Sequence, residues 1–220
     1  MFYDALKNDH GLPFNPFKSL VVPRPIGWLS TISKDGIINL APYSFFNALS
    51  YDPPFVMISA GCRQDGSKKD TVQNAEDTGE FVCNMVNYDL RDQMSKTAEM
   101  FAPNIDEMKE AGLEAEPAKI VKPPRVKAAP VHFECLYHDT VILPGNEPES
   151  VHHVMFGKVI GVHIKDEFIT EQGLVDILKI RPLARLGYKD YTTVDSKLSM
   201  AKRSPEEEIA ARRAAQAAAE

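Results

Sequence analysis

Short apolar runs separated by turn residues dominate the first part of the chain. Residues 27–33 (GWLSTIS) and 37–41 (IINLA) flank Lys34-Asp35-Gly36, and an Asp-Gly pair between two β-prone runs is typical of a hairpin. The next run, PPFVMISAG, begins with two prolines, which a strand tolerates at its start but not in its centre. This pattern predicts two antiparallel strands followed by a buried strand.

Helical spacing follows in three short segments. Ser67 is placed to cap a helix that runs to Thr78, and Gly79 is placed to end it. Apolar residues recur one turn apart within residues 88–100 and again within residues 105–111, just before a glycine. We therefore expect short helices inserted between the strands.

The β pattern returns after residue 120. Apolar and polar positions alternate in the segment VHFECLYHD, a second apolar stretch covers residues 154–164, and the turn residues GNEP lie between the two. Because strands outnumber helices and recur in hairpin-like pairs, we expect a mainly β fold. Its form would be an antiparallel, Greek-key-like barrel with peripheral helices, rather than a βαβ sheet.

The chain of 220 residues, 44% of them hydrophobic, can fill one large core. We expect one barrel domain over residues 1–196. The alanine-rich residues 197–220 would form a helical extension, because Ser204 is a suitable cap, proline follows it, and acids fill the first turn. An exposed tail is the alternative, since short isolated helices are marginal in water.

Composition and charge exclude several classes of protein. The formal net charge of -6 argues against a nucleic-acid-binding protein, which usually has a basic face. Three cysteines without a C-x-x-C pair favour a reducing compartment over a disulfide framework or a zinc cluster. The N-terminus carries acids and prolines instead of a secretory signal, and no apolar run approaches the ~20 residues of a membrane span. We expect a cytoplasmic protein with neither nucleic acid nor membrane as a partner.

A candidate anion site lies at the predicted helix start, SKKDT. Lys68, Lys69 and the Thr71 hydroxyl would join the backbone N–H groups and positive dipole end that favour an anion there. The alternative is an ordinary capping box, in which Asp70 already uses this potential and the lysines face water. Arg24, fixed between two prolines, could likewise hold a phosphate or carboxylate, or could be an ordinary surface arginine.

A candidate wall for a flat ligand lies in the segment NLAPYSFFN. It mixes aromatic rings with small polar side chains: Tyr43, Ser44, Phe45, Phe46 and Asn47. Such a mixture would suit the apolar faces and polar rim of an aromatic ligand, although aromatic stripes are more often part of a core.

Metal and nucleophile motifs find no support in the sequence. His152 and His153 are adjacent, and neighbouring strand residues face opposite ways, so we expect no metal site there. Trp28 is expected in the core or an interface. The sequence lacks the G-x-S-x-G, P-loop and G-x-G-x-x-G patterns. A bound cofactor is therefore a better source of reactivity than a nucleophilic side chain.

Three segments taken together resemble the flavin reductase-like family, which is built on the FMN-binding split barrel. They are RPIGWLSTISKDGIINLAPYSFFNALSYDPPFVMIS, KKDTVQNAEDTGEFVCNMV and RPLARLGYKDY. The resemblance implies FMN held non-covalently at a homodimer interface, with its ring along Tyr43 to Asn47 and its phosphate near Ser67 to Thr71. It thereby favours the phosphate interpretation of Lys69 and Thr71.

The same resemblance implies roles for residues outside these two segments. Ser59 would reach the polar rim of the flavin ring, and Arg24 would reach the phosphate or the ribityl chain. Arg185, Tyr188 and Tyr191 match a late family segment that lies near the flavin or the dimer interface. The alanine-rich extension has no counterpart in this resemblance.

The function that the resemblance implies is that of an NAD(P)H:flavin reductase. NADH or NADPH would stack on the flavin and pass hydride to its N5 atom, and reduced flavin would then serve oxygen, a carrier or a partner oxygenase. The alternative is a non-catalytic FMN-binding carrier or a redox-responsive module. A third interpretation keeps the barrel but makes its aromatic residues core only, as in a structural or interaction protein.

Overall fold

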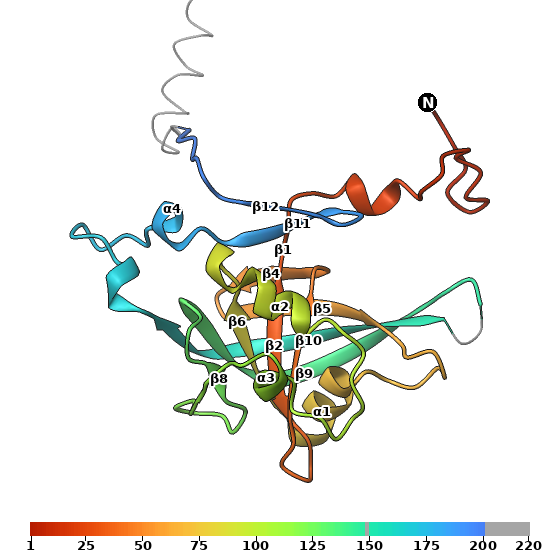
Figure 1. The fold of residues 1–220 in the computed structure, drawn as a ribbon. Helices are drawn as coiled ribbons and strands as arrows, with labels where there is room; N and C mark the ends of the chain where they lie inside the picture. The colour runs from red at the N-terminus through yellow and green to blue at the C-terminus, as the bar shows by residue number, and fades with distance from the viewer. Residues whose placement is uncertain (148–149, 201–220) are drawn as a thin grey trace, which may run out of the picture.

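A seven-stranded antiparallel sheet forms the centre of the molecule in the computed structural model, which describes residues 1–147 and 150–200. The sheet is strongly curved, and its strand order is β3-β2-β6-β9-β10-β5-β4 (Figure 1). Its strands are β2 (Gly27–Ile32), β3 (Ile38–Tyr43), β4 (Phe46–Tyr51), β5 (Pro54–Gly61), β6 (Glu80–Met85), β9 (Val131–Pro144) and β10 (Val151–Ile164). The prediction of a mainly β, antiparallel fold is confirmed.

The predicted hairpins form where the sequence places them. The β2–β3 turn contains Gly36 with φ +83°, and the N–H of Ser33 donates to the carbonyl of Ile37 at 2.9 Å. Glycine adopts this positive φ without a Cβ penalty, which explains the Asp-Gly signal. Strand β5 begins at Pro54, as expected, but only every second position along it is buried.

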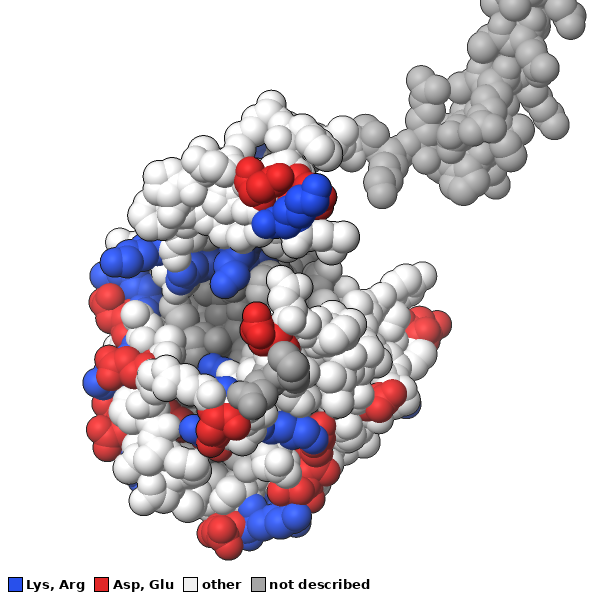
Figure 2. All heavy atoms as spheres, turned by 90° about the vertical axis from the view of Figure 1, so that its right-hand side faces the viewer, with Lys and Arg blue, Asp and Glu red and all other residues white. Residues whose placement is uncertain are grey.

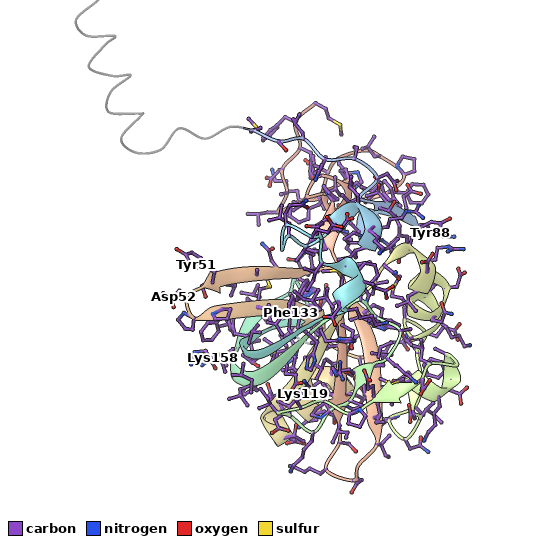
Figure 3. All side chains as sticks on the ribbon, turned by 90° about the vertical axis from the view of Figure 1, so that its left-hand side faces the viewer. Tyr51, Asp52, Tyr88, Lys119, Phe133 and Lys158 are labelled. Atoms are coloured by element: carbon purple, nitrogen blue, oxygen red, sulfur yellow. The ribbon has the colours of Figure 1, made fainter. Side chains whose placement is uncertain are left out.

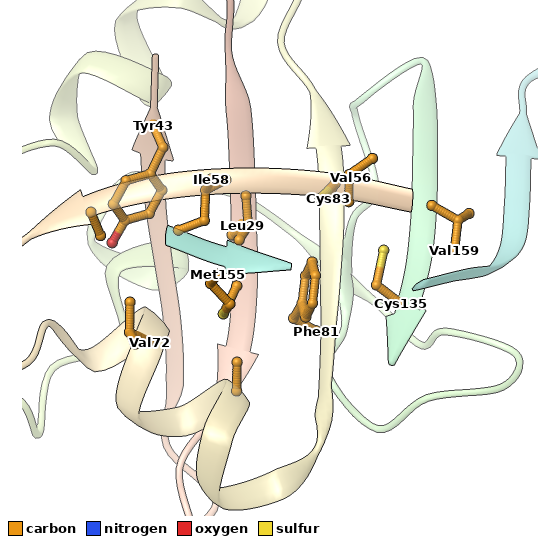
Figure 4. Packing of buried hydrophobic residues seen from close by; sticks show 12 residues of the cluster. Leu29, Tyr43, Val56, Ile58, Val72, Phe81, Cys83, Cys135, Met155 and Val159 are labelled. Atoms are coloured by element: carbon orange, nitrogen blue, oxygen red, sulfur yellow. The ribbon is translucent and has the colours of Figure 1, made fainter. Parts of the chain in front are cut away.

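Two apolar clusters cover opposite faces of β2. Leu29 belongs to the cluster between the strands of the barrel, and Trp28 belongs to a second cluster that includes residues of α2 and α3. Both side chains are fully buried. Because adjacent strand residues face opposite ways, a strand covered on both faces reads as a continuous apolar run. Figure 4 shows the first cluster, in which Met155 and Phe81 pack among the strands and Val72 approaches them from α1.

Helix α1 (Asp70–Thr78) lies beside the barrel and starts later than its sequence signal indicates. Its N-cap is Lys69, which makes no side-chain capping bond. The prediction of Ser67 as N-cap is wrong, because the Ser67 hydroxyl and N–H donate instead to Asp65 Oδ1 at 2.6 and 3.0 Å, in a local Asx turn. Gly79 ends the helix with φ +78°, as expected.

The remaining helical segments are one or two turns long. The predicted helices within residues 88–100 and 105–111 are confirmed as a 3₁₀ turn followed by α2, and as α3. Those among residues 1–147 and 150–200 are η1 (Phe17–Ser19), η2 (Tyr88–Leu90), α2 (Arg91–Lys96), α3 (Glu107–Glu110), η3 (Asp166–Phe168) and α4 (Ile177–Ile180).

Two smaller sheets complete the described part of the chain. One joins β1 (Arg24–Pro25), β11 (Leu183–Gly187) and β12 (Asp190–Thr193), and lies above the barrel beside the N-terminal segment (Figure 1). The other pairs β7 (Ala115–Glu116) with β8 (Arg125–Val126).

The β4–β5 hairpin projects from the body of the molecule. Figure 3 shows it with Tyr51 and Asp52 at its tip. The predicted helical extension covers residues 197–220; residues 197–200 lie in no helix or strand, and residues 201–220 lie outside the described residues. The domain division at residue 196 therefore stays a prediction.

Candidate functional site

A cavity of about 470 Å³ opens where β3, the start of α1 and the segment after α2 meet. Three of the residues that the sequence singles out, Tyr43, Lys69 and Thr71, line it together. Its other walls are formed by Asn39, Ala41, Pro42, Cys62, Arg63, Gln64, Asp65, Asp70, Thr97, Ala98, Glu99, Met100, Phe101 and Glu107. This volume is within the usual range for small-molecule sites, about 300–1,000 Å³.

A chain of buried polar side chains runs along the inner wall of this cavity. Thr71 Oγ1 donates to Asn39 Oδ1 at 2.7 Å, and Asn39 Nδ2 donates to Glu107 Oε1 at 2.9 Å. The second carboxylate oxygen, Oε2, accepts the backbone N–H of Leu40 at 2.9 Å. A side-chain hydrogen bond also joins Tyr43 to Thr71. The chain ties α1 and α3 to strand β3.

Burial shifts the ionisation of both ends of this chain. It raises the pKa of the Tyr43 hydroxyl to about 12, although the hydrogen bond with Thr71 acts in the opposite direction. It also raises the pKa of the Glu107 carboxyl, against the effect of the hydrogen bonds from Leu40 and Asn39. Both shifts follow from removing a charged form from water. Figure 4 shows the Tyr43 hydroxyl at the edge of the apolar cluster, on the side of α1.

The start of α1 gives the cavity a basic, hydrogen-bond-donating end. The first N–H groups of an α-helix lack intrahelical partners and carry a positive partial charge. Lys69 is exposed beside them, and no ion pair to it is found within residues 1–147 and 150–200. Arg63 also lines the cavity, where its guanidinium pairs with Asp70. Asp65 and Asp70 line the same end, but Asp70 is paired with Arg63, so Lys69 and the free N–H groups are the donors available to an anion there.

The outer wall of the cavity is the segment from Thr97 to Phe101. Thr97 is anchored in the core, because its hydroxyl accepts the indole N–H of Trp28 at 2.8 Å. Trp28 is thus a core residue, as one of the two sequence interpretations has it. Met100 further along is 84% exposed, and Lys96 lies 5.5 Å from the centroid of the Phe101 ring. The wall is fixed at one end and open to solvent at the other.

A second group of predicted residues meets above the barrel. The Arg24 guanidinium lies 5.4 Å from the centroid of the Phe45 ring, and Arg24 pairs with Arg185 across β1 and β11. Arg185 in turn lies 4.4 Å from the centroid of the Tyr191 ring and donates to the Tyr191 hydroxyl and to the Tyr188 carbonyl.

The side chain of Arg24 is already engaged. It is buried, and its Nη1 donates to the backbone carbonyls of Val21, at 2.8 Å, and Lys18. Burial lowers the pKa of its guanidinium, and the charge of Arg185 adds to this effect. In the structure Arg24 therefore holds the N-terminal segment in place.

The other predicted residues link these two groups along the chain. Ser44 and Phe45 form the bend between β3 and β4, and the N–H of Ser59 donates to the Phe45 carbonyl at 2.8 Å. Phe46 packs over Gly27, where a Cβ would come within 2.5 Å of its ring. Asn47 follows on exposed strand β4.

One face of the molecule is hollowed. Figure 2 shows a depression between the upper part of the molecule and the barrel below, with lysine and arginine side chains along its upper side.

Neither a metal site nor a membrane span is found among residues 1–147 and 150–200. No cluster of three or more histidine, cysteine, aspartate or glutamate side chains could hold a metal ion there. His152 is exposed and His153 is buried, so the two face opposite ways as expected. No helix in the same residues is long and apolar enough to cross a membrane.

Sequence reasoning missed the residues that complete the cavity. Asn39 stands in the quoted segment NLAPYSFFN, and its position beside the aromatic residues was the available signal. Glu107 is 68 residues from Asn39 along the chain, in a segment that reads only as a short amphipathic helix. Nothing in local spacing could have joined these two.

Comparisons with known proteins agree with this architecture. A family model described as flavin reductase like domain matches residues 19–183. An uncharacterized protein of Aquifex aeolicus is 48% identical over 172 residues, 78% of this chain and 85% of that protein.

Two solved structures show the same fold. Nitrilotriacetate monooxygenase component B from Bacillus cereus has a TM-score of 0.83 at 26% identity, covering 91% of this chain and 98% of its own. A protein with a split barrel domain from Shewanella frigidimarina has a TM-score of 0.77 at 20% identity, covering 93% of this chain and 100% of its own. The split barrel implied by the sequence resemblance is confirmed.

Proposed function

Because this chain belongs to the flavin reductase like domain family, we propose that it is an FMN-dependent oxidoreductase. The observation that carries the proposal is the cavity that sets the basic start of α1 against the polar and aromatic residues of β3. In more detail, we propose an NAD(P)H:flavin reductase. When bound, FMN would supply the redox chemistry, hydride transfer from a nicotinamide and onward transfer of the electrons.

The donor set of the cavity fits a phosphate at one end. Lys69 and the N–H groups of the first turn of α1, with Thr71 among them, would hold the phosphate of FMN. Thr71 would act through its backbone, because its side chain is 1% exposed and its hydroxyl donates to Asn39. The chain's own N–H groups and one lysine therefore bind and orient the phosphate.

The bend after Tyr43 fits the flavin ring. Ser44 and Asn47 would serve the polar rim, and Phe45 and Phe46 would pack against an apolar face. Ser59 lies beside this bend through its bond to Phe45 and would contact the same rim. These side chains orient the ring and exclude water from one face of it.

The second group of predicted residues would act indirectly. Arg24, Arg185 and Tyr191 fix the N-terminal segment and the small sheet above the hollow. We propose that a second copy of the chain covers this face, giving a homodimer. Support comes from the exposed apolar residues Phe14, Phe17 and Leu20, and from β4, an edge strand whose residues are almost all exposed.

The electron acceptor is proposed to be oxygen, a carrier or a partner oxygenase in the cytoplasm. The similarity to the Bacillus cereus monooxygenase component B supports an oxygenase partner for this chain too. An open outer wall with Met100 exposed is consistent with access for a second substrate, NADH or NADPH, beside the flavin.

The test is spectroscopic. Purified protein should be yellow or should quench FMN fluorescence on titration, and anaerobic mixing of the FMN complex with NADH or NADPH should bleach the flavin on a catalytic timescale. FMN binding without bleaching by either nucleotide would leave a non-catalytic FMN carrier and refute the reductase. No FMN binding at all would refute the flavoprotein itself.

A further inference from the structure

We propose that Glu107 is a positioning residue for the cofactor site, which acts through Asn39 and Thr71 to fix the first turn of α1. This inference rests on the proposed function, because the first turn of α1 is the proposed seat of the FMN phosphate. It assigns a role to a buried carboxylate that touches the cavity but has no part in the mechanism described above.

The contacts of Glu107 set the direction of the hydrogen bonds that Asn39 makes. Its two oxygens face two donors, the backbone N–H of Leu40 and the side-chain amide of Asn39, both at 2.9 Å. A carboxylate accepts at both oxygens, whereas a protonated carboxyl would have to donate from one of them. The surroundings of Glu107 therefore match its ionised form.

The ionised carboxylate fixes which way the Asn39 amide points. Its NH₂ group must face Glu107, so its carbonyl oxygen must face α1. That oxygen accepts the hydroxyls of Thr71, at 2.7 Å, and of Thr31, at 3.3 Å. Thr31 in turn accepts the amide of Asn74 on α1 at 3.1 Å.

The Thr71 hydroxyl connects α1 to this network. Thr71 has one hydroxyl proton, and Asn39 receives it. The bonds from Thr71 to Asn39 and from Asn39 to Glu107 tie α1 to strand β3 at Thr71, two residues after the N-cap Lys69, and Asn74 adds a second tie through Thr31.

Because these hydrogen bonds have a fixed direction, replacing one carboxylate oxygen of Glu107 by an amide NH₂ group should disturb the whole network. In Glu107→Gln, one side-chain group becomes a donor that faces a second donor. Either the N–H of Leu40 loses its acceptor, or Asn39 must flip and turn its NH₂ group toward Thr71 and Thr31. Both outcomes release the first turn of α1 from its present contacts, because a buried polar group left unsatisfied is costly.

A second substitution should restore the match of donors and acceptors, because it moves the negative charge from residue 107 to residue 39, its neighbour in the hydrogen-bond network. In the double variant Asn39→Asp/Glu107→Gln, the new carboxylate at position 39 accepts from Thr71, from Thr31 and from the introduced glutamine amide. The glutamine oxygen then accepts from Leu40. Asn39→Asp alone would set two carboxylates against each other and should be the most damaging change.

The experiment compares the four proteins by titration with FMN and with riboflavin, which lacks the phosphate. For Glu107→Gln we expect FMN affinity to fall about tenfold and riboflavin affinity to stay unchanged, since a tenfold change matches the loss of one hydrogen bond of ordinary strength. The FMN affinity of Asn39→Asp should fall further. The double variant should recover the FMN-to-riboflavin affinity ratio of the wild type.

Each outcome decides the matter. An unchanged ratio in Glu107→Gln, or a double variant weaker than both single variants, would overturn the positioning role while leaving FMN binding by the wild type intact. Wild-type protein that binds neither ligand would overturn the proposed function, and this role with it. If Glu107→Gln does not fold, the double variant carries the test, because it must fold and keep the wild-type ratio.

Discussion

Two buried glutamates of this fold have opposite surroundings. Glu134 on β9 has no exposed surface and accepts the backbone N–H groups of Lys119, Ile120 and Val121 at 2.8, 2.6 and 3.1 Å. His163 Nε2 lies 2.5 Å from its Oε1. Burial raises the pKa of the Glu134 carboxyl, but these hydrogen bonds outweigh it and bring the pKa to about 2.

Glu107 is nearly as buried but has fewer donors from other residues. Asn39 and the backbone of Leu40 donate to it, and burial raises the pKa of its carboxyl. A carboxylate with three or four donors is stabilised as an ion, whereas one with two donors keeps part of its desolvation cost. Glu134 is therefore a structural anchor, whereas Glu107 lies beside a binding cavity, where an uncompensated desolvation cost is tolerated.

The largest expected effect comes from removing the charge of the anchor. Glu134→Gln replaces one acceptor oxygen by a donor that faces backbone N–H groups, so we expect a loss of roughly 3–5 kcal/mol in the free energy of unfolding. Urea titration measures it. The matched control is Glu80→Gln, because Glu80 accepts one N–H from the same segment, that of Lys122, at 2.9 Å.

The comparison predicts that Glu134→Gln lowers the stability of the fold without changing how the site discriminates FMN from riboflavin. The FMN-to-riboflavin affinity ratio of Glu134→Gln should equal that of the wild type under conditions where the variant is folded. If Glu134→Gln and Glu80→Gln lower the free energy of unfolding equally, the three hydrogen bonds from residues 119–121 to Glu134 do not anchor the fold as their geometry indicates.

The next effect is the loss of stability in acid. The folded pKa of Glu134 is about 2, below its ordinary value of 4.5, so the folded state binds fewer protons than the unfolded state between these values. Its contribution is fully present above about pH 4.5 and is lost as the pH falls toward 2, by about 3 kcal/mol in total. Urea titrations from pH 6 to 2.5 should show a shallower decline in Glu134→Gln than in the wild type.

On the cavity side, the expected effects are on binding and are smaller. Lys69→Ala should weaken FMN binding by about 10- to 150-fold, as removal of one charge-assisted contact of roughly 1.5–3 kcal/mol would do. Riboflavin binding should not change. Lys68→Ala is the matched control, because Lys68 is the adjacent lysine and already pairs with Glu76. Equal losses in the two variants, measured by fluorescence titration, would show a general charge effect in place of a phosphate contact.

Most of the fold could be predicted from the sequence because local chemistry decides it. The Asp35-Gly36 turn, the proline at the start of β5 and the glycine after α1 act within a few residues of themselves. The one misplaced cap has the same origin, since Ser67 had two local partners available and the bond to Asp65 formed in place of a helix cap.

The site could be predicted only in part, because its residues come from distant segments. The helix-start pattern indicated Lys69 and Thr71, the aromatic–polar segment indicated Tyr43, and a family resemblance favoured both; the structure places all three on one cavity. The direction of their hydrogen bonds depends on Glu107, which a short helix brings to Asn39 from 68 positions away. Arg24 shows the converse, because a position fixed by two prolines gave no hint that backbone carbonyls would occupy its guanidinium.

The smallest expected effect is on the stability of Glu107→Gln, and its sign sharpens the comparison. The folded pKa of Glu107 is raised, so between its ordinary value and the raised value the folded state binds more protons than the unfolded state. Wild-type stability should therefore fall as the pH rises through this window, opposite to the effect of Glu134. Glu107→Gln lacks the titrating carboxyl.

The free energy of unfolding of Glu107→Gln at neutral pH should lie within about 1 kcal/mol of the wild type, because the lost hydrogen bond is offset by the removal of a buried charge. Parallel urea titrations at pH 4 and pH 7 measure the difference between the two proteins. A difference that moves in favour of the wild type as the pH rises would mean that Glu107 is a second anchor, and that its two donors satisfy it as fully as the four satisfy Glu134.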